Sequence, residues 1–165
     1  MSDKCPFREG CYIIEEAYIV PAGRVDLGVP LYDATLTVEP DPSGRLITHG
    51  AGLVSNVAVI SLLEDYDRLD IIMKMGQGFC FHLKNPIIQG GKVFSDKVKS
   101  RIRFIPQDSF DQIEDEIFNR WVTSLRIVNG KDENGNGDFT GRHRDQDNTP
   151  HPACLCEKPD SEAQP

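Results

Sequence analysis

Strict alternation of apolar and polar residues in two stretches strongly limits what this chain can fold into. Residues 32–39 (YDATLTVE) and residues 97–104 (KVKSRIRF) both repeat with a period of two. Successive side chains of a β-strand point to opposite faces of a sheet, so this period is typical of a strand that buries one face. The two stretches therefore predict a protein built mainly from antiparallel strands.

Five further segments are apolar and rich in β-branched or aromatic residues, and they predict strands at 11–20, 45–54, 57–63, 71–75 and 79–83. The PDPSG sequence at 40–44 predicts the turn of one hairpin, and Gly76-Gln77-Gly78 predicts the turn of another. Residues 21–30 and 85–91 are rich in Pro and Gly, and we expect them to be loops.

After Pro106 the apolar period lengthens to three or four residues, which predicts one amphipathic helix over 109–128. Ser109 can cap this helix, and Gln112 can complete a capping box. Asn129-Gly130 is typical of a helix end. The apolar stripe consists of Phe110, Ile113, Ile117, Trp121, Leu125 and Val128, and Phe118 and Val122 widen it.

These elements predict a mainly β (α+β) fold: an antiparallel β-sandwich or small barrel of seven to eight strands with one C-terminal amphipathic helix. We expect three parts: an N-terminal tail at 1–10, a β-rich globular domain at 11–130, and a polar acidic tail at 131–165. The last part holds four basic and eight acidic residues and only two large apolar ones, Phe139 and Leu155. Such a composition does not bury enough apolar surface to order itself.

Charge and hydropathy exclude several classes of function. The 165-residue chain has 26 acidic and 18 basic residues and a formal net charge of -8. This balance disfavours a general nucleic-acid binder and adsorption to an anionic membrane. No apolar run is long enough to span a bilayer, and the N-terminus lacks the apolar stretch of a signal peptide. We therefore expect a cytoplasmic protein without a nucleic-acid or membrane partner.

Cysteines in both polar ends of the chain raise the possibility of a zinc site. Zinc takes four thiolate or imidazole ligands, usually from two close pairs. Cys5 and Cys11 could supply one pair, and Cys154 and Cys156 the other, with His151 in reserve. A disulfide between the ends and thiols without a partner are the alternatives, and the odd total of five cysteines disfavours a closed disulfide framework.

The DENGNGD sequence at 132–138 partly matches a calcium-binding loop. Asp132, Asn134 and Asn136 stand at alternate positions and Gly137 follows, as in the first half of an EF-hand loop. The twelfth position, where a Glu is expected, is His143. A solvated Gly/Asn loop is the alternative interpretation.

Cys80 and His82 are two residues apart on a predicted strand, so they face the same way. A Cys–His pair can form an activated thiolate, and His49 could complete a small metal-dependent site. The alternative is that Cys80 is a small buried hydrophobic residue.

The basic side of residues 97–104 is the most unusual surface feature of the sequence. Lys97, Lys99, Arg101 and Arg103 repeat at intervals of about 6.6–6.8 Å along a strand and repel one another unless compensated. They could protect an edge strand, pair with acids such as Asp111, Glu114 or Glu15, or bind an acidic partner.

No phosphate-binding loop, dinucleotide fingerprint, HExxH motif or GxSxG elbow is present. We therefore expect a non-enzymatic interaction or assembly module, an accessory or structural subunit that docks on a protein partner or on a second copy of itself. A β-barrel that binds a small apolar ligand is the first alternative. A small metal-dependent enzyme built on Cys80, His82 and His49 is the second.

Overall fold

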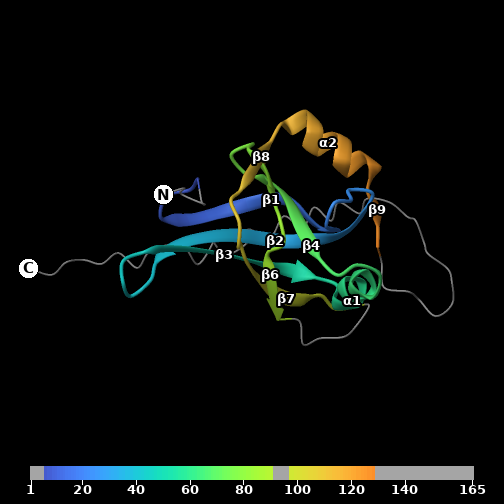
Figure 1. Cartoon of the computed structure of the whole chain (residues 1–165), viewed down its shortest axis with the longest axis horizontal. Coiled ribbons are helices and arrows are strands. Elements are labelled where there is room, and N and C mark those ends of the chain that lie inside the picture. Colours follow the sequence, from blue (N-terminus) through green and yellow to red (C-terminus); the bar gives the residue numbers. More distant parts are fainter. Residues whose placement is uncertain (1–5, 91–96, 129–165) are drawn as a thin grey trace, which may run out of the picture.

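The computed structural model describes residues 6–90 and 97–128, which form nine strands and two helices (Figure 1). The elements in chain order are β1 (Gly10–Pro21), β2 (Leu27–Pro40), β3 (Leu46–Val54), α1 (Asn56–Asp65), β4 (Leu69–Met75), β5 (Cys80–Leu83), β6 (Ile87–Gly90), β7 (Ser100–Ile105), β8 (Asp111–Ile113), α2 (Asp115–Ser124) and β9 (Arg126–Ile127). The prediction of a mainly β fold is therefore confirmed.

The strands form one continuous sheet in the order β6-β7-β3-β2-β1-β4-β5-β8, and β9 pairs with β2 outside this path. Every pair on the path is antiparallel, whereas β9 runs parallel to β2. Within the described residues the two end strands, β6 and β8, do not pair with each other, so the sheet is not closed. The predicted sandwich or closed barrel is thus not confirmed.

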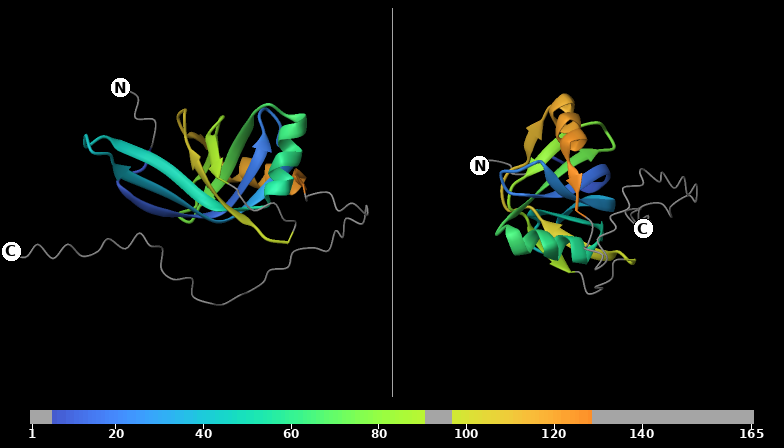
Figure 2. Two further views of the ribbon diagram at one scale, coloured as in Figure 1. Left: turned by 90° about the horizontal axis from the view of Figure 1, so that it is seen from below. Right: turned by 90° about the vertical axis from the view of Figure 1, so that its right-hand side faces the viewer.

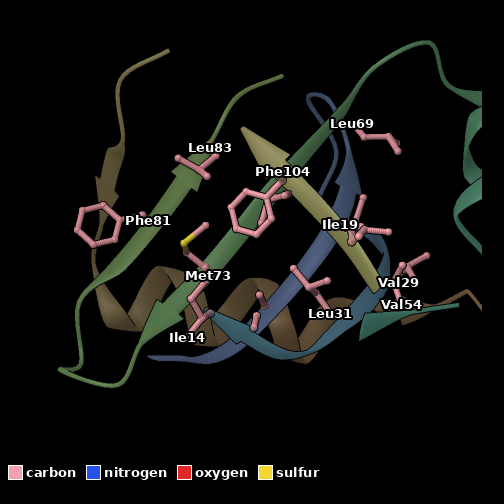
Figure 3. Close-up of a cluster of buried hydrophobic side chains, with 14 of the residues drawn as sticks. Ile14, Ile19, Val29, Leu31, Val54, Leu69, Met73, Phe81, Leu83 and Phe104 are labelled. Atoms are coloured by element: carbon pink, nitrogen blue, oxygen red, sulfur yellow. The ribbon is translucent and has the colours of Figure 1, made fainter. Parts of the chain in front are cut away.

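The sheet curves so that its two halves share one core. Phe104 of β7 belongs to the same buried cluster as Met73 of β4 and Leu83 of β5, although three strands separate β7 from β4 (Figure 3). A flat sheet could not bring these side chains together, because neighbouring strands lie about 4.8 Å apart. The cluster fills the concave side of the sheet with fully buried side chains.

Residues 57–63 were expected to form a buried strand, but they lie in α1. Ser55 caps this helix, and its hydroxyl accepts a hydrogen bond from the Ala58 N–H at 3.3 Å. Ala58 and Leu62, four residues apart, are buried in the main core. A short continuous apolar run does not distinguish a buried strand from a buried helix, which explains the error.

The helix predicted at 109–128 is much shorter in the structure. Residues Asp111–Ile113 pair with β5 as strand β8, so α2 begins only at Asp115. Glu114 is the cap residue and forms no side-chain capping bond, so the capping box of Ser109 and Gln112 is wrong. The backbone N–H and C=O groups of Asp111–Ile113 pair with β5, so they are not available for the first turns of the predicted helix.

α2 covers the convex face of the sheet, on the side opposite to the main core. Its one buried residue, Phe118, packs against Val20 of β1, Ile72 of β4 and Cys80 of β5. The two helices accordingly lie on different sides of the molecule, with the sheet between them (Figure 2). α2 therefore covers the part of the convex face that β1, β4 and β5 form.

Two segments expected to be loops contain strands: Leu27 to Pro30 begin β2, and Ile87–Gly90 form β6. The expected turn at 40–44 is confirmed, with Gly44 at a φ of 82° and its N–H bonded to the Asp41 carbonyl at 2.8 Å. β7 begins at Ser100, so only residues 100–104 of the predicted strand 97–104 are strand. In the described part of the chain, no helix is both long and apolar enough to cross a membrane.

Gly50 of β3 should tolerate no side chain. A Cβ at this position would lie 1.9 Å from the ring of Phe104, which is fully buried and has no space to move aside. We expect Gly50→Ala to lower the free energy of unfolding by about 1–3 kcal/mol, as overpacking of a core does. Urea unfolding will measure it.

Gly76→Ala is the matched control, because a Cβ there would meet only ordinary contacts at 3.5 Å or more. The double variant Gly50→Ala, Phe104→Leu should regain part of the loss. Equal stability of the two alanine variants would contradict the described packing of β7 on β3.

Candidate interaction face

The basic residues of β7 lie in a row of side chains that crosses five strands on the convex face. Strand register places Gln89 of β6 beside Arg103, Arg103 beside Ala51 of β3, Ala51 beside Thr35 of β2, and Thr35 beside Ile13 of β1. Directly paired residues of an antiparallel sheet project on the same side. We call this surface the basic face and define it by Ile13, Tyr32, Thr35, Ala51, Leu53, Lys99, Arg101 and Arg103.

The orientation of this face follows from the alternation in β7. Ser100, Ile102 and Phe104 are buried on the concave side, and the intervening Arg101 and Arg103 are exposed. Ser100 also accepts a hydrogen bond from the side-chain amide of Asn56 at 2.8 Å, which ties β7 to the first residue of α1. The predicted two-sided character of this strand is therefore confirmed.

Tyr32 brings an aromatic ring next to the basic residues. Its side chain is 47% exposed, and Lys99 Nζ lies 4.6 Å from the centre of its ring. Partial burial raises the pKa of the Tyr32 hydroxyl, so the ring stays neutral at physiological pH. At the other end of the face Ile13 is 64% exposed. The face thus combines cations with apolar surface.

Arg101 and Arg103 form no ion pair within residues 6–90 and 97–128. Of the three acids expected as their partners, Asp111 pairs with Lys84 at 2.8 Å. Glu114 lies at the start of α2 on the distant β8 side, and Glu15 lies in β1, which two strands separate from β7. β7 itself lies between β6 and β3, so it is not an edge strand, and the edge-protection interpretation is wrong for it. Lys97 and Lys99 lie exposed just before the strand.

The structure does not bring Cys80, His82 and His49 together. His49 of β3 pairs with Glu39 at 3.0 Å, and three strands separate β3 from β5, which carries Cys80 and His82. His82 Nε2 is 2.8 Å from Asp70, a buried carboxylate that also accepts the Asn85 N–H at 2.9 Å. These two hydrogen bonds identify Asp70 as a structural acceptor beneath α2.

Cys80 is not an activated thiol. Burial beside α2 and the nearby carboxylate of Asp115 raise its pKa to about 11. The thiolate, which is the nucleophile, is therefore scarce at neutral pH. Lys74 pairs with the same carboxylate at 2.9 Å and only partly offsets its effect. The interpretation of Cys80 as a small buried hydrophobic residue fits these contacts.

No group of three or more His, Cys, Asp or Glu in the described ranges is placed to hold a metal ion. Cys11 is disulfide-bonded, and a sulfur in a disulfide is not the thiolate that zinc requires. Cys80 is free, so the partner of Cys11 lies outside the described residues. The other candidate ligands, Cys5, Cys154, Cys156, Asp132, Asn134 and Asn136, also lie outside them.

No family model matches the chain, and no curated protein or solved structure is significantly similar to it. The function of the chain therefore has to be inferred from its own geometry.

Sequence reasoning found the cations of the basic face but missed Ile13, Tyr32, Ala51 and Leu53. The alternation within 32–39 already places Thr35 and Thr37 opposite the buried Ala34, Leu36 and Val38. The pairing of β2 with β3 and of β3 with β7 is not encoded in any one segment. Only this register places the four missed residues on the same face of the sheet as the arginines.

Cys80 should resist thiol reagents in the native protein. We expect no iodoacetamide labelling of the peptide that contains Cys80 at pH 7.5, because the thiol is buried and its raised pKa keeps it protonated. Labelling should appear only in denaturing urea, as measured by mass spectrometry of digests. Rapid native labelling would restore a catalytic role for Cys80.

A pH effect of definite sign follows from the same thiol. Its folded pKa of about 11 exceeds the ordinary value of 9.0, so the native state holds the proton more tightly. Its contribution to stability is complete below pH 9 and is lost as pH rises through 11. Between pH 9 and 11 the Cys80→Ala variant should therefore lose less stability than the wild type, as urea unfolding at several pH values will show.

Asp70→Ala should lower the free energy of unfolding by about 2–4 kcal/mol, because it removes a buried carboxylate and leaves the Asn85 N–H and His82 without their acceptor. Asp67→Ala is the matched control, since Asp67 is exposed. Its effect should stay within about 0.5 kcal/mol. Urea unfolding will compare the two, and an equal loss would contradict the role of Asp70.

Proposed function

We propose that the protein is a non-enzymatic interaction module that binds an acidic, extended segment of a protein partner on the basic face. One observation carries the proposal: Arg101 and Arg103 project from an interior strand and form no ion pair among the described residues. Like charges two residues apart on a strand destabilise the sheet slightly. A partner that supplies carboxylates would remove this repulsion.

The mixed chemistry of the face supports the same function. Interfaces combine apolar contacts at the centre with charged groups that set specificity and association rate. Tyr32 and Ile13 offer exposed apolar surface, and Ala51 and Thr35 lie between Ile13 and Arg103 as small side chains. An extended segment could lie across this shallow row. A second copy of the chain is the other partner that such a face could take.

The two other functions considered from the sequence receive less support. An apolar ligand would need a cavity inside the sheet, but Phe81, Leu83, Met73 and Phe104 fill that space with almost no exposure (Figure 3). An enzyme using Cys80, His82 and His49 would need groups that converge. The depression outside α2 is lined by exposed side chains, namely Glu116, Asn119, Arg120, Thr123 and Ser124.

The double variant Arg101→Glu, Arg103→Glu should lose binding to acidic peptides. The probe is a fluorescent 12-residue peptide of alternating Glu and Thr, with a Gln/Thr peptide of the same length as the neutral reference. We expect the wild type to prefer the Glu peptide and the variant to bind it at least tenfold more weakly. Fluorescence anisotropy at 50 mM and 500 mM salt will measure both affinities.

Arg68→Glu, Arg120→Glu is the matched control, because it makes the same change in net charge at two exposed arginines away from the basic face. It should bind within about twofold of the wild type. Raised salt should weaken binding of the wild type, since exposed charges are screened. Equal binding of the Glu and Gln peptides, or equal loss in both double variants, would refute the proposal.

A further inference from the structure

β3 is longer than the neighbouring strand β7 that pairs with it. β7 pairs with β3 only over residues 50–54, and its last residue is Ile105. Pro106 follows, and a proline has no backbone N–H with which to continue a ladder. Residues 46–49 therefore pair with β2 on one side and with no strand of the described chain on the other. The β2–β3 hairpin that carries them projects beyond the end of β7 (Figure 2).

We call the side of residues 46–49 that faces away from β2 the open edge. In an antiparallel strand the N–H and C=O of one residue point to the same side, and the side alternates from residue to residue. Two of the four residues therefore present both groups outward. Leu46 is 50% exposed and Ile47 is 39% exposed, one on each face of the sheet.

The open edge lacks the usual protection against strand pairing. Natural sheet edges are protected by lysines, prolines or bulges. Residues 46–49 (LITH) contain neither lysine nor proline, and their register with β2 is regular. β2 is paired in turn with β1, where Cys11 lies opposite Thr37. The edge is thus held in a strand conformation before anything binds, which lowers the entropy cost of adding a strand.

Two arginines mark the ends of the open edge on the convex face. Side chains alternate along β3, so Arg45, Ile47 and His49 point to the same face as Ala51. Ala51 lies opposite Arg103 of β7. Arg45 therefore precedes the open edge, and Arg103 follows it in the neighbouring strand. Neither arginine forms an ion pair in the part of the chain that the structure describes.

The acids of the hairpin are engaged within the hairpin itself. Glu39 pairs with His49 at 3.0 Å. Asp41 accepts hydrogen bonds from the Ser43 N–H at 2.8 Å and from the Arg45 N–H at 3.0 Å. The hydrogen bond with the Ser43 hydroxyl is the main cause of the lowered pKa of Asp41, and the charge of Arg45 is a minor one. The guanidinium of Arg45 is thus available to a carboxylate from outside.

These positions define the side chains that an added strand should carry. A strand in line with β7 would run antiparallel to β3, opposite residues 49 to 45 in turn. A carboxylate opposite His49 would lie two residues from Arg103, about 6.6–6.8 Å along the strand direction. A carboxylate opposite Arg45 would face that arginine directly, and a β-branched residue would suit the place opposite Ile47. The matching pattern is acid-x-apolar-x-acid.

The same charges disfavour a second copy of the chain as the occupant. A two-fold pairing centred on Ile47 would place Arg45 of the second copy opposite His49. That position is two residues from Arg103, so it would bring two cations together. Like charges at this distance on neighbouring positions destabilise a sheet. A segment with carboxylates at both ends has no such conflict.

We infer that the open edge binds an extended acid-x-apolar-x-acid segment of a partner protein as an additional antiparallel strand. This inference goes beyond the proposed function, because the basic face binds through side chains, whereas the open edge binds through the backbone. The two sites share only Arg103. Main-chain hydrogen bonds supply affinity in this mode of recognition, and alternate side chains supply specificity.

Peptides with methylated backbone nitrogens test the inference without altering the protein. The probe is a fluorescent nine-residue peptide with Glu-Thr-Ile-Val-Glu at its centre and Ser or Thr elsewhere. One version carries N-methyl groups at the first, third and fifth of these central residues, and another at the second and fourth. Only one set of amides faces β3, so we expect one version to bind at least tenfold more weakly and the other within about twofold of the probe.

Arg45→Glu should weaken binding of the unmethylated probe at least fivefold in fluorescence anisotropy. Arg68→Glu is the matched control, because it makes the same charge change at an exposed arginine outside the hairpin, and it should bind within about twofold of the wild type. In ¹H–¹⁵N spectra of the full chain, the probe should slow amide exchange at two alternate residues of 46–49.

The outcomes separate this site from the proposed function. If Arg101→Glu, Arg103→Glu abolishes binding of the Glu/Thr peptide but neither methylated version differs from the probe, the open edge is refuted and the proposed function stands. If one methylated version loses binding and the Glu/Thr peptide is not preferred over the Gln/Thr peptide, the open edge stands and the proposed function fails.

Two further results would also overturn the inference. One is slow amide exchange at residues 46–49 in the free chain together with no binding of the probe, which means that the edge is already occupied. The other is a mass of two chains by light scattering that excess probe reduces to one, which means that a second copy is the natural occupant.

Discussion

The packing of Phe104 against the glycine at position 50 is the contact on which the surface of this protein depends. The ring occupies the space that a side chain on β3 would fill, and it joins β7 to the core shared with β4 and β5. Because side chains alternate along a strand, burying Phe104 and Ile102 forces Arg101 and Arg103 outward. The apolar core and the basic face are two consequences of one register.

The division of the convex face between α2 and solvent follows from a second packing interaction. Phe118 finds its buried site between β1, β4 and β5, so α2 covers that half of the sheet. After α2, strand β9 pairs in parallel with the start of β2, where Arg126 lies opposite Leu27. The described residues therefore end close to the half of the sheet that α2 covers. The half made by β7, β3 and β2 keeps its exposed Tyr32 and its arginines.

Local patterns in the sequence predicted what local interactions determine. The strands at 11–20, 32–39 and 45–54 and both hairpin turns follow from alternation and turn residues. The strand expected at 57–63 became α1 because Ser55 caps a helix whose burial at Ala58 and Leu62 has the helical spacing of four. The first turns of the helix expected at 109–128 became β8 because Cys80–His82 offered a free strand edge. Pairing between distant segments decided these cases, and no window of sequence contains it.

The same limit explains why the arginines were noticed and their surroundings were not. Four basic residues in alternation are visible in any reading of 97–104, but their neighbours come from β1, β2 and β3. Only the complete strand order shows that β7 lies in the interior of the sheet. This position changes how its basic residues are interpreted. On an edge strand, lysines and arginines protect against unwanted pairing, whereas on an interior strand they have no such use.

The cost of keeping two unpaired arginines on an interior strand is small, which makes their function separable from the fold. Two unit charges about 6.8 Å apart in water repel by about 0.6 kcal/mol, and salt reduces this further. A domain of this size is stable by roughly 5–15 kcal/mol, so the repulsion does not threaten folding. The arginines also contribute nothing to core packing, because β7 contacts the core through Ile102 and Phe104 on its opposite side. Their charge can therefore change without unfolding the sheet, and any loss of binding that follows reports on the face itself.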